Sequence, residues 1–322
     1  MRKVLTVVPL QPHHKEILEQ ISPELEFCYG ENETVTPQQV QEADIIFGNV
    51  NPDYLKGAYH LELLQLNSAG ADQYMGEGIM PEGAKLANAT GAYGLAVGEH
   101  MLAMVYTMMK KINLYCKHME EHNWTDEGTV GSFYGANVLV VGLGDIGSEF
   151  AKRAHALGSR VYGVRRNKTE KPEYLEGIYT MEDLDRLLPM ADVVACSMPG
   201  NKETYHLFHK ERLARMKKTA ILANVGRGSL IPTQDLSEAL TEGIIGGVCM
   251  DVAETEPLPA DSPLWNLPNL ILTPHISGFY HLPETLERIV EIARENIQAV
   301  CEGRPVKNEV DFETGYRKFE RK

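Results

Sequence analysis

Short apolar runs alternate with polar, helix-like stretches through the first hundred residues. Most of these runs are continuous in their apolar character, which is typical of strands covered on both faces in a parallel sheet. The stretches 13–21 and 36–43 have a helical pattern and separate some of the runs. The pattern predicts a small doubly wound domain. Its expected strands are KVLTVV, LEFCYG, ADIIFGNV, LELLQLNSAG and KLANATG.

One long helical pattern covers residues 95–119, LAVGEHMLAMVYTMMKKINLYCKHM. Apolar residues lie on nearly all of its sides, as in a helix that is buried between two bodies. We interpret its methionines as adaptable core packing, and a cofactor site is the weaker reading. The pattern therefore predicts a single continuous, buried helix.

A second series of strands and helices begins at Asn137. Six strands with intervening helices match the architecture of a dinucleotide-binding domain, so the fold class is α/β with two doubly wound parallel sheets. The expected strands are VLVVG, RVYGV, DVVACSM, AILANV, GGVCMDV and LILTPH.

The segment 283–303 has the pattern of an amphipathic helix. Pro283 stands near its start and Gly303 just beyond its end, the usual places for these two residues. We expect this tail to leave the second domain and pack on the first. Its apolar face consists of Leu286, Ile289, Val290, Ala293, Ile297 and Val300.

The overall composition narrows the class of protein. A chain of 322 residues suits two domains. Its net charge of −14 repels phosphate backbones and no local basic stripe is evident, so we expect no nucleic-acid partner. The apolar run before Pro9 is too short for a signal peptide, and no run reaches the length of a membrane span. Five scattered cysteines without a CxxC pair indicate reduced thiols in a cytoplasmic protein: Cys28, Cys116, Cys196, Cys249 and Cys301.

The segment VLVVGLGDIG places a glycine turn between a buried strand and a helix. Gly142 permits the tight turn, Gly144 lets a pyrophosphate approach the backbone, and Gly147 lets the helix pack closely on the strand. The first amides of the helix then bind the phosphate charge. A packing turn without a ligand is the alternative, and it is the weaker one because both flanking elements are present.

Arg165 and Arg166 stand at the end of the second strand, eighteen and nineteen residues after Gly147. An NAD-specific site usually has an acidic residue there, which binds the ribose hydroxyls. A guanidinium instead matches a 2′-phosphate in charge and in bidentate geometry. The pair therefore predicts a preference for NADPH; the alternative is two solvated arginines at the end of a strand.

Three further apolar runs each end in a charged or titratable residue: Arg227, Glu256 and His275. The carboxyl ends of parallel strands meet at one crevice, so these side chains are expected to lie together beside the dinucleotide. Arginine has the fixed charge and fork that bind a carboxylate, histidine exchanges protons near neutral pH, and a neighbouring carboxylate stabilises the imidazolium. Taken singly they could be a solvated arginine, a turn residue and a core histidine. As a set behind a glycine turn they indicate reduction of a 2-keto acid.

Other histidines have the spacing of metal ligands on a helix. His118 and His122 are four residues apart, but the segment HMEEH lacks the order HExxH and no third ligand is evident. The pair His206 and His209 is interpreted in the same way. We therefore predict no metal site.

The chain also resembles the D-isomer-specific 2-hydroxyacid dehydrogenases, over most of its length and in several ordered motifs. NSAGAD resembles the family's substrate-carboxylate loop, NATGAYGLAVGEH the entry to its interdomain helix, and VVGLGDIG its cofactor fingerprint. The segments CSMPGNKETYHLF and MKKTAILANVGRG resemble those that lead to the family's arginine. DVAETEP and TPHISG resemble its glutamate and histidine segments.

The resemblance implies a role for each matching residue. Arg227 would bind the carboxylate and keto oxygen of the substrate, and Glu256 would partner the acid–base residue His275. Asp251 would hold the nicotinamide carboxamide. Backbone amides near Ala69 and Gly70 would complete the carboxylate site. The expected cofactor-binding residues are Gly142, Gly144, Asp145, Ile146, Gly147, Arg165, Arg166, Pro199, Val225 and Asp251.

The same resemblance implies a domain arrangement. Residues 1–98 with 284–322 would form a flavodoxin-like substrate domain, and residues 99–283 a Rossmann domain that binds NADP or NAD. It also implies a homodimer built largely around the cofactor domains.

The chain departs from the family pattern at three places, and these leave the substrate open. Arg165 and Arg166 replace the usual acid, Phe279 and Tyr280 follow ISG as bulky residues, and Pro232 stands where an acid or amide is frequent. The leading hypothesis is an NAD(P)-dependent reductase of a small 2-keto acid such as glyoxylate or hydroxypyruvate.

Two alternatives remain. One is a cofactor-sensing, corepressor-like protein that binds peptides and keeps the same three residues. The other is a phosphoglycerate-type dehydrogenase, although versions of that enzyme often carry a C-terminal regulatory domain that this chain has no room for.

Overall fold

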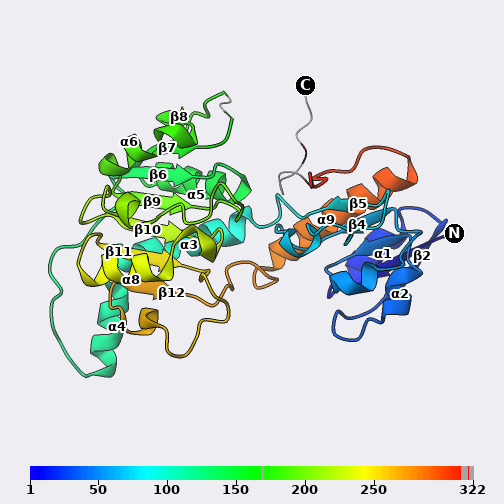
Figure 1. Ribbon diagram of the computed structural model, residues 1–322, viewed down its shortest axis with the longest axis horizontal. Helices are drawn as coiled ribbons and strands as arrows, with labels where there is room; N and C mark the ends of the chain where they lie inside the picture. Colours follow the sequence, from blue (N-terminus) through cyan, green and yellow to red (C-terminus); the bar gives the residue numbers. More distant parts are fainter. Residues whose placement is uncertain (168–169, 313–317, 319–322) are drawn as a thin grey trace. The chain divides into compact units, whose positions relative to one another are not determined.

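The computed structural model describes residues 1–167, 170–312 and 318. The chain forms two compact units, each built on one parallel sheet (Figure 1). Unit 1 combines residues 1–93 with the chain from Phe279 onward, and unit 2 runs from Gly94 to Gly278. Both crossings therefore lie five residues before the boundaries expected after residues 98 and 283. The first crossing coincides with the start of helix α3 (Gly94–Met109).

The sheet of unit 1 has five parallel strands in the order β2-β1-β3-β4-β5. This is the flavodoxin-like order of a doubly wound domain, so the fold expected for this part of the chain is confirmed. The apolar runs form strands because both faces are covered, and all residues of β3 and β4 are buried. The strands are β1 Arg2–Thr6, β2 Leu25–Tyr29, β3 Ile45–Phe47, β4 Leu63–Gln65 and β5 Lys85–Ala87.

Three helices of unit 1 begin at a proline: α1 (Pro12–Glu19), α2 (Pro37–Gln41) and α9 (Pro283–Cys301). Proline suits this position because its missing N–H would have no partner within the helix. Helix α9 packs against α1 and β4. The predicted apolar face of α9 is buried, with every one of its six residues at most 9% exposed.

The sheet of unit 2 has seven parallel strands in the order β12-β11-β10-β9-β6-β7-β8. All six predicted strands are present. The additional strand β8 is short and lies at the edge of the sheet, where its three residues are only partly buried. A partly buried edge strand does not need a continuous apolar run, and the sequence has none there. Chain order reverses between β6 and β9, which is the place where ligands bind in such sheets. The strands are β6 Asn137–Val141, β7 Arg160–Val164, β8 Gly177–Tyr179, β9 Val193–Cys196, β10 Ile221–Asn224, β11 Gly247–Met250 and β12 Leu270–Leu272.

The prediction of one buried helix over residues 95–119 is wrong in its second half. Helix α3 ends at Met109, and a separate helix α4 (Ile112–Glu120) follows after Lys111, whose φ of 57° is left-handed. Helix α3 is largely buried and packs against α5 (Asp145–Ala156), whereas no residue of α4 is buried. Hydrophobic periodicity did not reveal the break, because apolar residues continue through it into the exposed helix.

The remaining helices of unit 2 are short: α6 Leu184–Leu187, α7 Lys210–Leu213 and α8 Thr233–Thr241. A core of buried side chains from the strands, α8 and the neighbouring turns fills one face of this sheet, with Leu222, Leu236 and Leu240 among its members. Within the described residues, no helix combines the length and the apolar character that crossing a bilayer requires.

Candidate active site

The glycine turn lies between β6 and α5 in unit 2. Gly142 has a φ of 99°, a conformation that L side chains rarely adopt. A Cβ atom on Gly147 would stand 1.9 Å from the carbonyl oxygen of Gly142, so only glycine lets the helix approach the turn this closely. A Cβ atom on Gly144 would meet no atom within 4 Å. The turn is therefore tight at Gly142 and Gly147 and open at Gly144.

The start of α5 fits a diphosphate group. Gly144 is the N-cap and offers no side chain to the first amides of the helix, which a negative charge can therefore reach. Asp145 and Ile146 contribute the backbone of this first turn. The Asp145 carboxylate accepts a hydrogen bond from the Gly94 amide at 2.7 Å and so is directed toward the start of α3. Open space and backbone donors at one helix end are the features that a dinucleotide phosphate needs.

The two arginines of the NADPH hypothesis follow β7, which is hydrogen-bonded to β6. The Gly142 amide donates to the Val164 carbonyl at 2.9 Å, so the residues directly after β7 lie beside the glycine turn. Arg165 is partly buried and its amide donates to the Tyr179 carbonyl at 3.0 Å, while Arg166 is exposed. Both arginines thus lie at the sheet edge where the adenosine half of a dinucleotide is expected.

Pro199 and Val225 lie on the other side of the switch point, after β9 and β10. The Pro199 carbonyl accepts a hydrogen bond from the Thr204 hydroxyl at 2.7 Å. The Val225 amide donates to the Cys196 carbonyl at 3.0 Å. The cofactor-site candidates of unit 2 therefore follow neighbouring strands along a single edge of the sheet.

Arg227 follows β10 in a turn that is held by a buried amide. Asn224 is fully buried; its Nδ2 donates to the Arg227 carbonyl at 2.9 Å, and its Oδ1 accepts from the Gly226 amide at 3.0 Å. A Cβ atom on Gly228 would stand 1.8 Å from the Ala253 carbonyl oxygen. The turn that carries Arg227 is thus in close backbone contact with the segment that leads to Glu256.

His275 and Glu256 form a direct pair, as the sequence predicted. The His275 Nδ1 atom lies 2.8 Å from Glu256 Oε2, and the other carboxylate oxygen accepts from the Ala253 amide at 2.9 Å. The side chains are 49% and 38% exposed, so the ring is open to a substrate. His275 has a φ of 53°, which is uncommon for a residue other than glycine. Because β10, β11 and β12 are adjacent, Arg227, Glu256 and His275 follow three neighbouring strand ends.

Asp251 directly follows β11 and is only 1% exposed. Its carboxylate accepts hydrogen bonds from the Thr273 hydroxyl and from the amides of Ile276 and Ser277. The side chain is therefore directed toward the segment that carries His275.

Ala69 and Gly70 belong to the other unit, in the loop after β4. The Ala69 carbonyl accepts from Asn88 Nδ2 at 2.9 Å, and the Gly70 carbonyl accepts from the Ser68 hydroxyl at 2.7 Å. Side chains therefore fix the orientation of both peptide groups.

The first residue of this loop, Asn67, is held from several elements. Asn67 and Asn49 exchange two hydrogen bonds between their side chains and backbone amides, at 2.7 and 3.2 Å. Asn67 Nδ2 donates to the Tyr280 hydroxyl at 2.5 Å, and the Tyr93 hydroxyl donates to the Asn67 carbonyl. Burial raises the pKa of both phenols. The bulky Tyr280 is thus a support of the loop.

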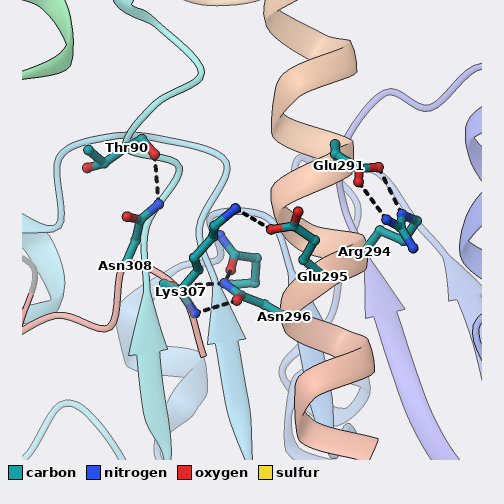
Figure 2. A network of polar contacts seen from close by, with 8 residues as sticks. Thr90, Glu291, Arg294, Glu295, Asn296, Lys307 and Asn308 are labelled. Atoms are coloured by element: carbon teal, nitrogen blue, oxygen red, sulfur yellow. Dashed lines mark hydrogen bonds and ion pairs between the residues drawn. The ribbon is translucent and has the colours of Figure 1, made fainter. Parts of the chain in front are cut away.

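A polar network that includes the buried Asn296 joins α9 to the segment that follows it (Figure 2). On α9, the Nδ2 atom of Asn296 donates to Gln65 Oε1 at 2.6 Å, at the end of β4. Asn296 also binds the backbone of Lys307, whose side chain pairs with Glu295. Nearby, Asn308 Nδ2 donates to the Thr90 carbonyl at 2.7 Å. The segment after α9 is therefore tied to the strand that supports the loop.

Comparison with known proteins identifies the family. The family model described as "D-isomer specific 2-hydroxyacid dehydrogenase, NAD binding domain" matches residues 102–277. The chain is 33% identical over 269 residues to glyoxylate/hydroxypyruvate reductase B of Pectobacterium atrosepticum, covering 81% of this chain and 82% of that one. The chain belongs to the D-isomer specific 2-hydroxyacid dehydrogenase family.

Solved structures agree with this assignment. A D-isomer specific 2-hydroxyacid dehydrogenase family protein from Aeromonas salmonicida is 31% identical, with a TM-score of 0.85 over 97% of this chain and 99% of that chain. D-Lactate dehydrogenase from Aquifex aeolicus, complexed with NAD and lactic acid, is 26% identical with a TM-score of 0.74 over 94% and 96%. The protein is thus an NAD(P)-dependent 2-hydroxyacid dehydrogenase, and the expected cofactor class is confirmed.

Sequence reasoning missed several residues that support the site of this dehydrogenase. Asn224 and Thr273 each stand at the end of an apolar run. A search for any polar residue at a strand end would therefore have found both of them. Asn49 also follows an apolar run and would have been found in the same way. Asn296 carries no such signal, because its partner Gln65 lies far away in the chain.

Two of the dehydrogenase's histidines that have the spacing of metal ligands lie within ion-pair distance of a glutamate. His118 pairs with Glu127, and His206 pairs with Glu254. Within the described ranges, His13, His14 and Glu287 form a group with the spacing of metal ligands.

The hydrogen bonds of His14 do not suit a metal at that group. Its Nδ1 accepts from the Gln11 amide at 3.1 Å, so the proton of the neutral ring lies on Nε2, which faces Glu287 at 2.9 Å. The nitrogen that faces Glu287 therefore has no lone pair for a metal. The absence of a metal site stays a prediction.

Proposed function

We propose that this dehydrogenase reduces a small 2-keto acid, such as glyoxylate or hydroxypyruvate, and prefers NADPH as its cofactor. The contact that carries this proposal is the 2.8 Å pair between Glu256 and His275, at the strand end next to the one that carries Arg227. The choice of substrate is supported by the name of the Pectobacterium relative, a glyoxylate/hydroxypyruvate reductase.

Each residue has one task in the proposed reaction. In unit 2, Arg227 binds the substrate carboxylate through its two-pronged guanidinium. In unit 1, the amides near Ala69 and Gly70 are the proposed donors to a carboxylate. A nicotinamide cofactor held at the glycine turn would supply the hydride for this reduction. His275 delivers the proton to the keto oxygen, and Glu256 stabilises the imidazolium that holds this proton.

A substrate panel tests the proposed reaction. Turnover of 2-keto acids is followed at 340 nm, where the reduced nicotinamide absorbs. Fast reduction of glyoxylate or hydroxypyruvate supports the proposal. Tight cofactor binding without turnover of any keto acid would favour a sensor. The His275→Ala variant is expected to lose at least ~10²-fold in kcat, the usual scale for acid–base catalysis.

We predict that kcat/KM is ~10-fold or more higher with NADPH than with NADH, because one charge-assisted hydrogen bond to the 2′-phosphate contributes about 1.5–3 kcal/mol. Replacing Arg165 and Arg166 with serine should remove most of this preference and leave kcat/KM with NADH nearly unchanged. Arg186→Ser is a suitable control, since Arg186 is an exposed arginine of the same unit that pairs with Asp183. A wild-type enzyme that prefers NADH would refute the assignment of the arginines.

The proposal also includes a homodimer in the cytoplasm, with substrate-binding residues in unit 1. Dimerisation is supported by large apolar side chains on α4 and in the segment after it, where Met119, Trp124 and Tyr134 are 73%, 104% and 83% exposed. Large apolar side chains are frequent at protein interfaces. The cytoplasm is supported by the five free cysteines, of which Cys196 and Cys249 are buried.

A further inference from the structure

Both carboxylate oxygens of Asp251 accept hydrogen bonds from the segment that carries His275. Oδ1 accepts from the Thr273 hydroxyl at 2.5 Å and from the Ile276 amide at 3.0 Å. Oδ2 accepts from the amide and the hydroxyl of Ser277, at 3.0 and 2.5 Å. The four donors come from residues on both sides of His275. Asp251 therefore holds the chain immediately before and immediately after the catalytic histidine.

These four hydrogen bonds occupy the acceptor capacity of the side chain. A carboxylate offers about four lone-pair sites, and each oxygen of Asp251 already receives two donors. Binding a nicotinamide carboxamide through the same carboxylate would require one of them to leave. The geometry therefore favours a role of Asp251 toward His275 over the role that the family resemblance implies for it.

The backbone at His275 explains why such support is needed. Its φ of 53° lies in the left-handed region, which a residue with a Cβ atom adopts at an energetic cost. Strained conformations of this kind persist where the surroundings fix them, and they gather at active sites. Here the His275 amide also donates to the Thr273 carbonyl at 3.0 Å, which closes a tight turn. Asp251 binds Thr273 at the start of that turn and the two residues that follow His275.

His100 on α3 also contacts this group of residues. Its Nε2 atom lies 2.9 Å from the Thr273 hydroxyl and 3.8 Å from Asp251 Oδ1. Because the Thr273 hydroxyl gives its only hydrogen to Asp251, it must accept from His100, whose Nε2 therefore carries a proton. The chain of contacts runs from His100 through Thr273 to Asp251, and all of it lies within unit 2.

We infer that Asp251, Thr273, Ser277 and His100 are positioning residues for His275. They fix the backbone turn that directs the imidazole toward Glu256 and toward the substrate. This inference rests on the proposed acid–base role of His275. It assigns Asp251 no contact with the reacting atoms.

The experiment compares Thr273→Val, which keeps the shape of the side chain and removes the hydroxyl, with Thr273→Ser, which keeps the hydroxyl. We expect Thr273→Val to lower kcat ~10-fold or more, since a misplaced catalytic group costs up to ~10²-fold. The cofactor Kd, measured by fluorescence titration, should stay within ~2-fold of the wild type. The loss of kcat comes from an interaction made only in the transition state, and such an interaction does not contribute to cofactor binding. Thr273→Ser should restore most of the activity, which a purely structural loss of packing would not predict.

Thr285→Val is the matched control. Thr285 is also buried, at 1% exposure, and its hydroxyl has no hydrogen-bond partner among the described residues. This variant should keep the wild-type kcat. If Thr273→Val does not fold, His100→Leu and His100→Gln give the same comparison, since glutamine keeps an N–H donor and leucine does not.

Two results would overturn the inference. One is an unchanged kcat in Thr273→Val or His100→Leu. The other is a cofactor Kd that rises in these variants while kcat at saturating cofactor is retained, which would mean that the network serves nicotinamide binding. The proposed function fails separately: near-normal turnover by His275→Ala would remove His275 from the mechanism, whatever the Thr273 variants do.

Discussion

At the scale of single residues, the site depends on two side chains that modify one histidine. Glu256 contacts the His275 ring at Nδ1, and Asp251 binds the backbone on both sides of that residue. The first contact orients the ring, and the second fixes the backbone that carries it. The ring and its backbone are thus held by different carboxylates.

We predict that Glu256→Gln lowers kcat ~10-fold or more and leaves the cofactor Kd nearly unchanged. Glutamine has nearly the same shape but no charge, so the catalytic ring loses its carboxylate partner at Nδ1. The measurement is kcat for the keto acid at saturating cofactor, with wild type as reference. A wild-type kcat in this variant would show that the 2.8 Å contact does not serve catalysis.

At the scale of elements, loops after neighbouring strands hold one another in place. The loop after β9 is joined to the loop after β11 by His206 and Glu254, at 2.8 Å. The second carboxylate oxygen of Glu254 accepts from the Thr233 amide at 2.7 Å, at the start of α8. The segment between Asp251 and Glu256 is therefore fixed to its neighbours on both sides.

We predict that Glu254→Gln lowers the stability by about 1 kcal/mol near neutral pH, the usual value of one such hydrogen bond. Burial acts to raise the pKa of Glu254, but hydrogen bonds from Thr233 and the pairing with His206 outweigh it and hold the pKa below the ordinary 4.5. A lowered pKa means stabilisation that is present above about pH 4.5 and is lost as the pH falls through the folded value.

The measurement is the Tm of both proteins from pH 7 to pH 3.5. The difference in Tm should shrink below pH 4.5, because the wild-type carboxylate then becomes protonated as well. Lys210 is paired with the exposed Glu238, and Glu238→Gln serves as a surface control with little effect. A difference in Tm that stays constant over the whole range would contradict the assigned role of the Glu254 charge.

At the scale of the whole molecule, large apolar side chains of α4 and of the segment after it are exposed to water. A monomer would leave them uncovered. Helix α4 has no buried residue, and Trp124 is fully exposed. Exposed apolar area of this kind costs free energy in water unless a partner covers it.

We predict that replacing Met119 and Trp124 with glutamine converts the proposed homodimer to a monomer at micromolar concentration, because large aromatic side chains carry much of the energy of an interface. Light scattering coupled to size-exclusion chromatography measures the mass. Trp265→Gln is the control, since Trp265 is a 59% exposed tryptophan elsewhere in the same unit. A wild-type mass of one chain, or a dimer that survives both substitutions, would refute this interface.

The sequence by itself determined the two parallel sheets, the glycine turn and the strand ends that carry Arg227, Glu256 and His275. These follow from local signals: continuous apolar runs predict covered strands, and glycine spacing predicts a turn that a Cβ atom would block. Only the tertiary structure decided the break at Lys111, the short edge strand β8, the partners of Asp251 and the support of Asn67 by Tyr280. Each of these depends on which distant segments lie side by side, and hydrophobic periodicity carries no information about that.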